Sequence, residues 1–375
     1  MPREYKNGPG LSRTDAWAPI YSIVMSRFPT HFVVPCLYRL VVPVIASLRP
    51  NTPRTHAGTR GAHMAINVPL AKPSWLPRGK QARHEALMGV SLISPWLVGF
   101  LAFTLGPMVA SAVLSFTDWD LLTDPQWIAL QNYRAMLFED PLVIQSLKVT
   151  TVYAFTAVPL RVVAGLLIAV LLNQDIRVKS FIRTLFYLPS VVSGVAVAML
   201  WLWIFNTDFG LMNTLLRLVG ITGPAWLSDK TAVLPAFIIM SLWGVGGSMV
   251  IYLAGLQGVP TDLYEAAEMD GASAWRKFWH ITIPMISPVI FFNLVIGIIN
   301  ALQVFNEAYV MTQGGPENAS MFLMLLLFFN AFEYFKMGYA SALAWLIFFY
   351  ILALTLLVFR SSSSWVYYSG STRGR

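Results

Sequence analysis

Long apolar runs dominate the chain from residue 87 onward, and short polar stretches separate them. A helix needs about 20 mostly apolar residues to cross the ~30 Å hydrocarbon core of a bilayer. The pattern therefore predicts an all-α membrane protein with six transmembrane helices. We expect them at residues 87–116, 149–172, 181–205, 231–256, 284–305 and 339–359.

A seventh apolar run, residues 321–332, is too short to span a bilayer. It predicts an interfacial or re-entrant helix between the last two spans. Such a helix acts either as a lid or as a scaffold beside the outer vestibule, and we favour the scaffold.

Composition supports a membrane protein and excludes several other classes. Hydrophobic residues make up 56% of the chain and charged residues 12%, about half the charged share of a soluble domain. The single cysteine, Cys36, excludes an internal disulfide. The sequence contains neither a G-x-x-x-x-G-K-[ST] phosphate loop nor an H-E-x-x-H zinc motif. We therefore predict no catalytic residue, metal site or cofactor in this chain.

The net charge of +8 is distributed unevenly between the two sides of the predicted membrane domain. If residues 64–86 are cytoplasmic, twelve Lys and Arg residues from Lys72 onward fall on that side. Five fall on the other side: Arg134, Lys148, Arg217, Lys230 and Lys336. The positive-inside rule then places both termini in the cytoplasm, so the charge does not require nucleic acid as a partner.

Residues 1–63 do not fit this scheme. They carry eight Lys and Arg residues against two acids, and no helical periodicity is sustained. Arg39 interrupts their apolar run, residues 32–48. We predict a poorly structured extension, or a chain that starts near Met64. After this extension we predict a cytoplasmic segment at 64–86, a membrane domain at 87–360 and a cytoplasmic tail at 361–375.

A charged stretch, residues 261–283, separates the fourth and fifth predicted spans. Thr261 or Asp262 is expected to cap a first helix, and Gly271 can end it in the left-handed region. Ser273 can cap a second helix at residues 274–280, and Pro284 then starts the next span. The pattern predicts a cytoplasmic helix–turn–helix.

This predicted hairpin has two interpretations. Ala266 and Ala267 allow another surface to approach closely, and Glu265 offers a negative charge beside them. These features favour a docking element. The alternative is an amphipathic hairpin that lies on the membrane and only joins two spans.

The same stretch resembles a known loop. Glu265-Ala266-Ala267, Gly271 and Ile281-Thr-Ile283-Pro284 match the E-A-A-x₃-G-x₉-I-x-L-P loop of binding-protein-dependent ABC importer permeases, with Ile283 in place of Leu. Leu188-Pro189-Ser190, the Gly210–Asn213 run and Thr312-Gln-Gly-Gly-Pro316 resemble the carbohydrate-uptake branch, and the last of these resembles the first of its two paired permeases. The resemblance spans about residues 85–360.

The resemblance implies a type I ABC importer permease fold and a transport function without enzyme activity. Loop 261–283 becomes the coupling helix hairpin that docks on a separate ABC ATPase dimer, which binds ATP and Mg²⁺. A second permease and an extracytoplasmic solute-binding protein complete the system in the bacterial cytoplasmic (inner) membrane. The expected solute is a sugar or oligosaccharide, or alternatively glycerol 3-phosphate or another polyol. The coupling residues are Glu265, Ala266, Ala267, Asp270, Gly271, Ile281 and Pro284.

Polar residues within the spans mark a candidate solute pathway. On the fifth span, Asn293, Gly297, Asn300, Val304 and Glu307 recur at steps of three and four residues, with Gln303 beside them. Such a stripe can hydrogen-bond a hydroxylated solute. It can equally bond neighbouring helices together.

The fourth and second spans contribute further candidates. Trp243-Gly-Val-Gly-Gly-Ser248 joins an aromatic ring and a hydroxyl to glycines that allow bending or close packing. Arg161 lies deep in the second predicted span. Either it faces a cavity, or the span starts after Pro159 and Arg161 reaches the outer surface, which we favour.

Two other classes of function fit the sequence less well than an importer permease. A membrane-embedded enzyme needs convergent catalytic groups, and the acids here are scattered through loops. An ion-coupled secondary transporter usually carries intramembrane acids, whereas Glu307 alone lies near the edge of a span.

Overall fold

The computed structural model describes residues 80–175 and 177–367. The predicted extension 1–63, residues 64–79 of the predicted cytoplasmic segment 64–86, and the end of the tail from 368 lie outside the described residues. The first half of the described chain comprises α3 (Lys80–Phe100), η2 (Leu101–Leu105), α4 (Gly106–Leu114), β1 (Thr117–Asp118), β2 (Gln126–Trp127), α5 (Gln131–Arg134), η3 (Ala135–Glu139), α6 (Pro141–Leu172), α7 (Lys179–Tyr187), η4 (Leu188–Val191), α8 (Gly194–Ile204) and α9 (Leu211–Leu218).

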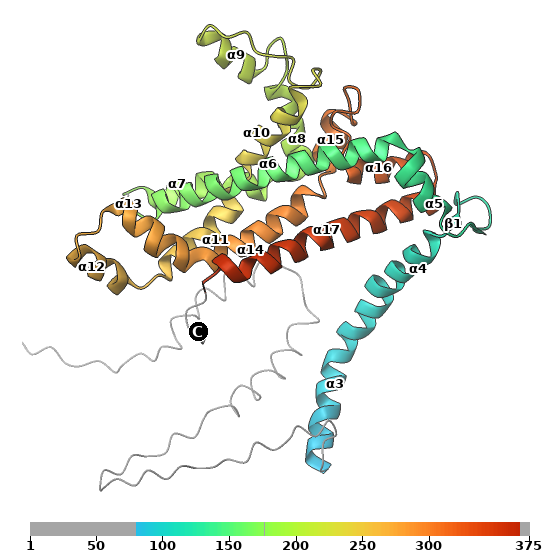
Figure 1. The fold of residues 1–375 in the computed structure, drawn as a ribbon, viewed down its shortest axis with the longest axis horizontal. Coiled ribbons are helices and arrows are strands. Elements are labelled where there is room, and N and C mark those ends of the chain that lie inside the picture. The colour runs from blue at the N-terminus through green and yellow to red at the C-terminus, as the bar shows by residue number, and fades with distance from the viewer. Residues whose placement is uncertain (1–79, 176, 368–375) are drawn as a thin grey trace, which may run out of the picture. The chain divides into compact units, whose positions relative to one another are not determined.

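The second half is entirely helical between its loops. It comprises α10 (Val233–Trp243), α11 (Gly246–Gln257), α12 (Thr261–Met269), α13 (Ala274–Lys277), η5 (Phe278–Thr282), α14 (Ile283–Ala301), α15 (Asn306–Met311), α16 (Leu323–Phe328), η6 (Phe329–Glu333) and α17 (Met337–Trp365). Figure 1 shows α7, α12 and α13 together at one end of the bundle, with α5 and β1 at the other. We call the first the hairpin end.

The prediction of six spans is confirmed. Four helical segments are long and apolar enough to cross a membrane: Arg83–Leu114, Pro141–Leu172, Ala274–Met311 and Met337–Trp365. Two bent pairs supply the others, Lys179–Val191 with Gly194–Ile204 and Val233–Trp243 with Gly246–Gln257. The six predicted ranges all overlap these segments.

Both bends have local causes. The first pair turns by 101°, where Pro189 lacks an amide hydrogen and Val192 is extended at ψ 140°. The second pair turns by 47° where Gly244 and Val245 leave the helix ladder. Because a broken helix exposes backbone groups, such bends in membrane proteins occur beside protein or a cavity and not beside lipid.

Helix α6 is the centre of the bundle, and α10, α11, α14 and α16 pack against it. Tyr252 of α11 and Phe237 of α10 are both fully buried, and Phe237 meets Phe322 with ring centroids 5.6 Å apart. These contacts fix α10 and α11 relative to α6 and to the segment that leads into α16.

Helix α6 begins earlier than predicted, at Pro141 instead of residue 149. Asp140 caps it by accepting a hydrogen bond from the Leu142 amide at 2.9 Å, and Pro141 occupies the first helical position. The Asp140 carboxylate also accepts a bond from the Tyr339 hydroxyl at 2.7 Å. The starts of α6 and α17 are thereby tied together.

The short apolar run forms α16 and η6, which together span Leu323–Glu333. Leu323, Leu325 and Leu326 are buried, and α16 contacts both α6 and α17. The Leu323 amide donates to the Thr150 hydroxyl of α6 at 3.0 Å. This segment is therefore packed into the bundle, as expected of a scaffold.

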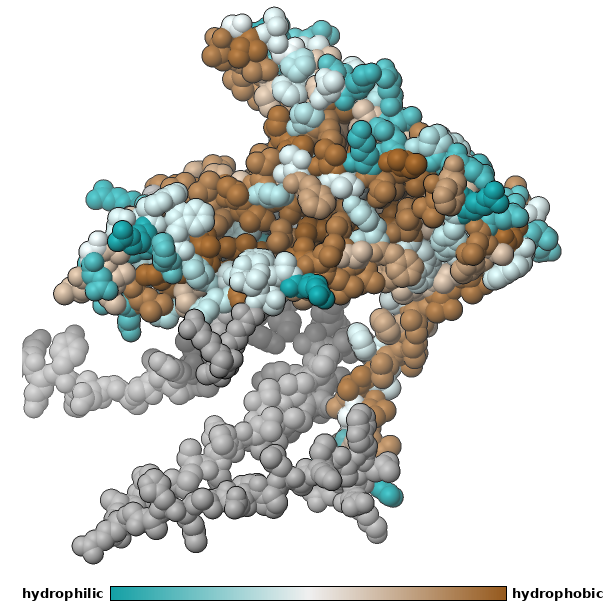
Figure 2. Space-filling model, in the orientation of Figure 1, coloured by the Kyte–Doolittle hydropathy of each residue, from teal (hydrophilic) through white to brown (hydrophobic). Residues whose placement is uncertain are grey.

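Apolar side chains cover the outside of the described bundle. Figure 2 shows a hydrophobic surface over its middle, with hydrophilic residues gathered at the hairpin end and over the loops near α9 and α15. From Arg83 to the end of α4, no residue of helices α3 and α4 is buried, and large apolar side chains are exposed on all sides. A helix that is apolar all round is stable in lipid or against another membrane helix.

Candidate functional site

The predicted helix–turn–helix is present as α12 and α13. Helix α12 ends in a Schellman motif: the Gly271 amide donates to the Glu268 carbonyl and the Ala272 amide to the Ala267 carbonyl, both at 2.9 Å. Gly271 has φ +73°. The prediction that Gly271 ends the first helix is confirmed.

The two helix starts have different caps. Ser273 accepts from the Arg276 amide at 3.4 Å, as predicted. The prediction of a Thr261 or Asp262 cap is wrong, because Pro260 is the N-cap residue and α12 begins at Thr261. Pro260 has φ −60° and ψ 130°, so its extended backbone starts the helix without a side-chain bond. Asp262 instead places its charge in the first turn, near the positive helix end.

The second helix does not stop at His280. Helix α13 continues through η5 into α14, so Pro284 lies within the first turn of α14 and not at the start of a separate helix. The hairpin is thus continuous with the fifth span through the π-helical segment η5.

Two side-chain contacts brace the hairpin. Lys277 forms an ion pair with Glu268 across the turn. The hydroxyls of Tyr264 and Thr282 are 2.9 Å apart and join α12 to η5. These contacts hold α12 at a fixed angle to the fifth span.

The hairpin presents an exposed surface that mixes polar and apolar groups. Glu265, Ala266, Asp270 and Gly271 are exposed, whereas Ala267, Ile281 and Pro284 are half-buried. Met269 is 89% exposed and Trp275 71% exposed. Apolar side chains this exposed at the end of a bundle are typical of a surface that another protein or a membrane covers.

Two cavities lie between α6, the α10–α11 bend and α14. The larger, about 340 Å³, reaches toward Glu307 and the η4–α8 break, and we call it the distal cavity. The smaller, about 240 Å³, lies toward the hairpin end beside α11 and is called the proximal cavity. Arg161, Gly244 and Asn300 line both, so the two cavities adjoin.

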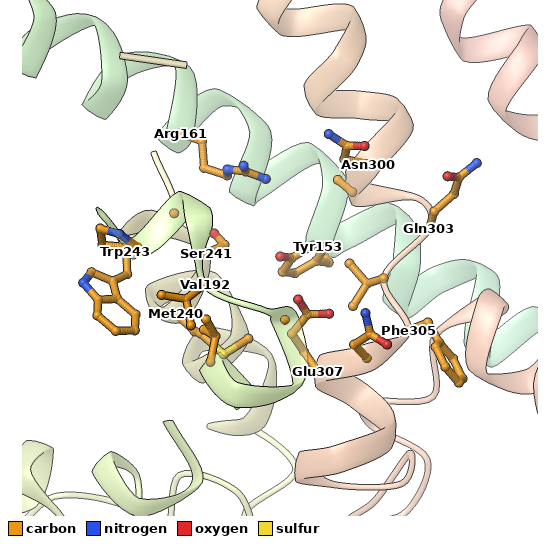
Figure 3. Close-up of a pocket in the computed structure, with 17 residues that line it drawn as sticks. Tyr153, Arg161, Val192, Met240, Ser241, Trp243, Asn300, Gln303, Phe305 and Glu307 are labelled. Atoms are coloured by element: carbon orange, nitrogen blue, oxygen red, sulfur yellow. The ribbon is translucent and has the colours of Figure 1, made fainter. Parts of the chain in front are cut away.

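The distal cavity combines an aromatic ring with polar and charged groups. Trp243, Asn300, Gln303 and Glu307 line it, together with Tyr153. In Figure 3 the Arg161 side chain extends from α6 into the space between α6 and α14. The residues that line the distal cavity suit a polar solute that also has apolar faces.

The proximal cavity is lined by small and hydrogen-bonding groups. Ser248, Asn293, Gly297 and Asn300 line it, and so does Tyr252. The Asn293 amide nitrogen donates to the Val289 carbonyl of its own helix at 3.0 Å. Its amide oxygen remains available to accept a hydrogen bond.

A family model described as "Binding-protein-dependent transport system inner membrane component" matches residues 161–367. The probable ABC transporter permease protein YesP of Bacillus subtilis is 45% identical over 297 residues, covering 78% of this chain and 96% of YesP. The chain belongs to this permease family. The bundle and its cavities are therefore those of a membrane transport subunit, and the chain's own role is not catalytic.

Two further similarities agree. The trehalose/maltose transport system permease protein MalF of Thermococcus litoralis is 32% identical over 276 residues, covering 73% of the permease and 93% of MalF. A crystal structure of a bacterial alginate ABC transporter, in complex with an alginate pentasaccharide-bound periplasmic protein, has a TM-score of 0.67 and 23% identity. That match covers 76% of the permease and 96% of the other chain, and it shows the type I importer permease fold.

All seven sequence-predicted pathway residues of the permease line one of the two cavities. Trp243, Gln303 and Glu307 line the distal cavity, Ser248, Asn293 and Gly297 the proximal one, and Asn300 both. Among the described residues, no side-chain hydrogen bond of Asn293, Asn300 or Gln303 reaches another helix. This disfavours the alternative in which these residues only hold helices together.

The predicted single face on the fifth span is interrupted in the permease. Helix α14 ends at Ala301, and Glu307 belongs to α15. Glu307 reaches the distal cavity because the turn after Ala301 redirects the chain. The helical spacing therefore selected residues that line the cavities, although the face it assumed is broken.

The interpretation that we favoured for Arg161 is wrong. Helix α6 continues through Pro159, so Arg161 lies well inside a membrane span and lines both cavities. Proline is tolerated within membrane helices where neighbouring groups compensate for the lost bond. A charge at this depth costs about 2.5–3.5 kcal/mol on insertion scales, so it marks function by default.

Sequence reasoning missed Tyr153 and Tyr252, which line the distal and proximal cavities. Tyr153 precedes Arg161 by eight residues, which is about 80° past two full helical turns, so the two side chains lie at the two edges of one broad helical stripe. That spacing was a weak signal. Tyr252 follows the predicted Ser248 by four residues on α11, so helical spacing also pointed to it, and it was overlooked.

Proposed function

We propose that this permease conducts a sugar or oligosaccharide through the distal and proximal cavities during ATP-driven import. The observation that carries the proposal is the row of polar groups between α6, the bent α10–α11 pair and α14. Trp243 offers a ring face to a sugar, and Asn300 and Gln303 offer amides to hydroxyls. The 340 Å³ distal cavity falls within the usual range for small ligands, about 300–1,000 Å³.

The relatives support a saccharide over another solute class. The MalF relative, at 32% identity, is described as a trehalose/maltose transport permease. A polyol such as glycerol 3-phosphate remains the alternative. It is small enough to occupy one cavity alone, whereas two adjoining cavities suit a solute of more than one ring.

We further propose that the hairpin, residues 261–283, is the coupling element that docks on a separate ATPase dimer. Glu265, Ala266, Ala267, Asp270 and Gly271 would face its cleft. Ile281 and Pro284 would join the hairpin to the fifth span. Because α13, η5 and α14 are continuous, closure of the ATPases would tilt α14 beside the cavities. ATP and Mg²⁺ would bind the ATPases and not this chain.

The proposed assembly has four kinds of component. This chain would pair with a second permease, and a solute-binding protein would deliver the solute from outside the cytoplasmic membrane of a bacterium. The charge distribution supports a cytoplasmic hairpin end, with both termini on that side. Arg177, Lys179, Arg276 and Lys277 belong to α7, α13 and the loop before α7, which gather at this end.

The test is ATP-dependent uptake by the complete importer in proteoliposomes, with labelled maltose and trehalose as probes. Glu265→Lys should abolish uptake while the complex still assembles, because it reverses the charge at the docking surface. Glu85→Lys makes the same charge change on exposed α3, outside the hairpin, and should leave uptake intact. Normal uptake by the Glu265 variant would refute the coupling role.

A further inference from the structure

Arg161 is the one charged residue among the described side chains that line the proximal cavity. In the distal cavity it is accompanied by Glu307. Neither residue forms an ion pair or a hydrogen bond with another described residue. Arg161 is shared by the two cavities and Glu307 lines only the distal one, so the proximal cavity is lined by a cation and by no carboxylate.

A second group in the proximal cavity also lacks a partner. Tyr252 is fully buried, and its hydroxyl has no hydrogen-bond partner among the described residues. A buried hydroxyl without a partner is unfavourable unless a ligand or water completes it. Tyr252 lines the same cavity as Arg161, and its hydroxyl, which is closed off from solvent in this structure, is a second polar group that a ligand there could complete.

We propose that the proximal cavity is an anion subsite, in which Arg161 and Tyr252 bind a negatively charged group attached to the saccharide. Arginine binds carboxylate or phosphate oxygens in a bidentate arrangement, and the tyrosine hydroxyl can donate a further bond. The volume of about 240 Å³ suits part of a solute, with the remainder in the distal cavity. The inference rests on the proposed function and narrows its substrate class to acidic saccharides.

The location of Glu307 agrees with this orientation of the solute. Glu307 lines only the distal cavity, where a carboxylate would repel an anionic group. The neutral, hydroxylated part of the solute can lie there instead, beside Gln303 and Trp243. An anion on the solute is thereby directed toward Arg161 in the proximal cavity.

The experiment compares two saccharides, each in three charge states. The complete importer, with its solute-binding protein, is given maltose and lactose, their C6-oxidised uronates and their 6-phosphates. We expect uptake of an anionic form, and the uronate and phosphate arms identify which anion is used. Arg161→Gln should lower uptake of that form at least about tenfold, and change uptake of a neutral form less than about twofold.

Three further variants separate an anion subsite from a structural role. Arg161→Lys keeps the charge without the planar fork and should retain part of the uptake. Tyr252→Phe removes only the hydroxyl and should raise the KM for the anionic form while the complex stays assembled. Lys148→Gln removes the same charge from an exposed position on α6, outside both cavities, and should have no effect.

Uptake of neutral saccharides alone would overturn the inference, and so would equal loss of neutral and anionic uptake in Arg161→Gln. The second result would indicate that Arg161 pairs with a carboxylate of the second permease. If no saccharide of any charge is taken up with ATP, the proposed function itself fails. That failure is distinguishable, because both results that overturn the inference alone require ATP-dependent saccharide uptake by the unmutated importer.

Discussion

Replacing Gly271 by alanine tests whether the turn of the hairpin depends on backbone conformation alone. A Cβ at this position meets no atom within 4 Å, so the substitution creates no clash. The backbone, however, has φ +73°, which costs a residue with a Cβ about 1–2 kcal/mol. That energy corresponds to a change of about 5- to 30-fold in the equilibrium between the closed turn and its open form.

Hydrogen exchange of the Ala272 amide measures this equilibrium directly. In the native turn that amide donates to the Ala267 carbonyl at 2.9 Å. In Gly271→Ala we expect its protection to fall by about 5- to 30-fold, because opening of the turn breaks this bond. In Gly271→Asn the protection of the Ala272 amide should fall less, because asparagine adopts the left-handed region more readily than alanine.

A glycine at the end of α11, just before the hairpin, serves as the matched control. Gly258 ends α11 with φ −85°, which any residue adopts, and a Cβ there lies 3.4 Å from the Gly255 carbonyl oxygen. Gly258→Ala should therefore leave exchange at Ala272 unchanged. Unchanged protection in Gly271→Ala, or an equal loss in Gly258→Ala, would refute the role assigned to the turn.

Three other substitutions probe the bundle. Gly246→Ala should destabilise the permease by about 1–3 kcal/mol or more, because the added Cβ would lie 2.0 Å from the Phe186 carbonyl oxygen. Gly247→Ala should not destabilise it, because the Cβ added there would lie 4.0 Å from its nearest neighbour, the Ser190 Cβ. Thermal unfolding in detergent measures both effects. Asn213→Ala removes two donated bonds and one accepted from Trp226, and limited proteolysis near α9 should accelerate. Gly244→Trp should block uptake without preventing assembly, because Gly244 lines both cavities and a Cβ added there lies no closer than 3.8 Å to any neighbour. Uptake at the original rate would show that the solute pathway lies elsewhere.

Most of the hairpin could be predicted from the sequence, because the residues that end and start its helices act locally. Gly271 and Ser273 act within one turn of their own positions, and both predictions are confirmed. The N-cap was missed for an equally local reason. An extended proline at 260 starts the helix without the side-chain bond that a Thr or Asp cap would supply.

The pathway was predicted less completely, because its geometry depends on bends. Periodicity identified Asn293, Gly297 and Asn300 as sharing one face, and they do line a cavity. Periodicity assumes straight helices, however, and so it could not predict that the break between η4 and α8 brings Pro189 and Gly194 to the distal cavity. Tyr252 was within its reach, because it follows Ser248 by four residues on α11. Arg161 was misjudged because Pro159 was interpreted as a boundary, although α6 continues through it.

The coupling hairpin and the cavities matter only if ATP, and not an ion gradient, drives the solute through this permease. The most direct test measures uptake of labelled saccharide by the reconstituted importer with ATP inside the vesicles and all ion gradients collapsed by ionophores. The account predicts uptake that needs both ATP and the solute-binding protein and disappears in Glu265→Lys. Uptake that persists without ATP and follows an imposed proton or sodium gradient would contradict it.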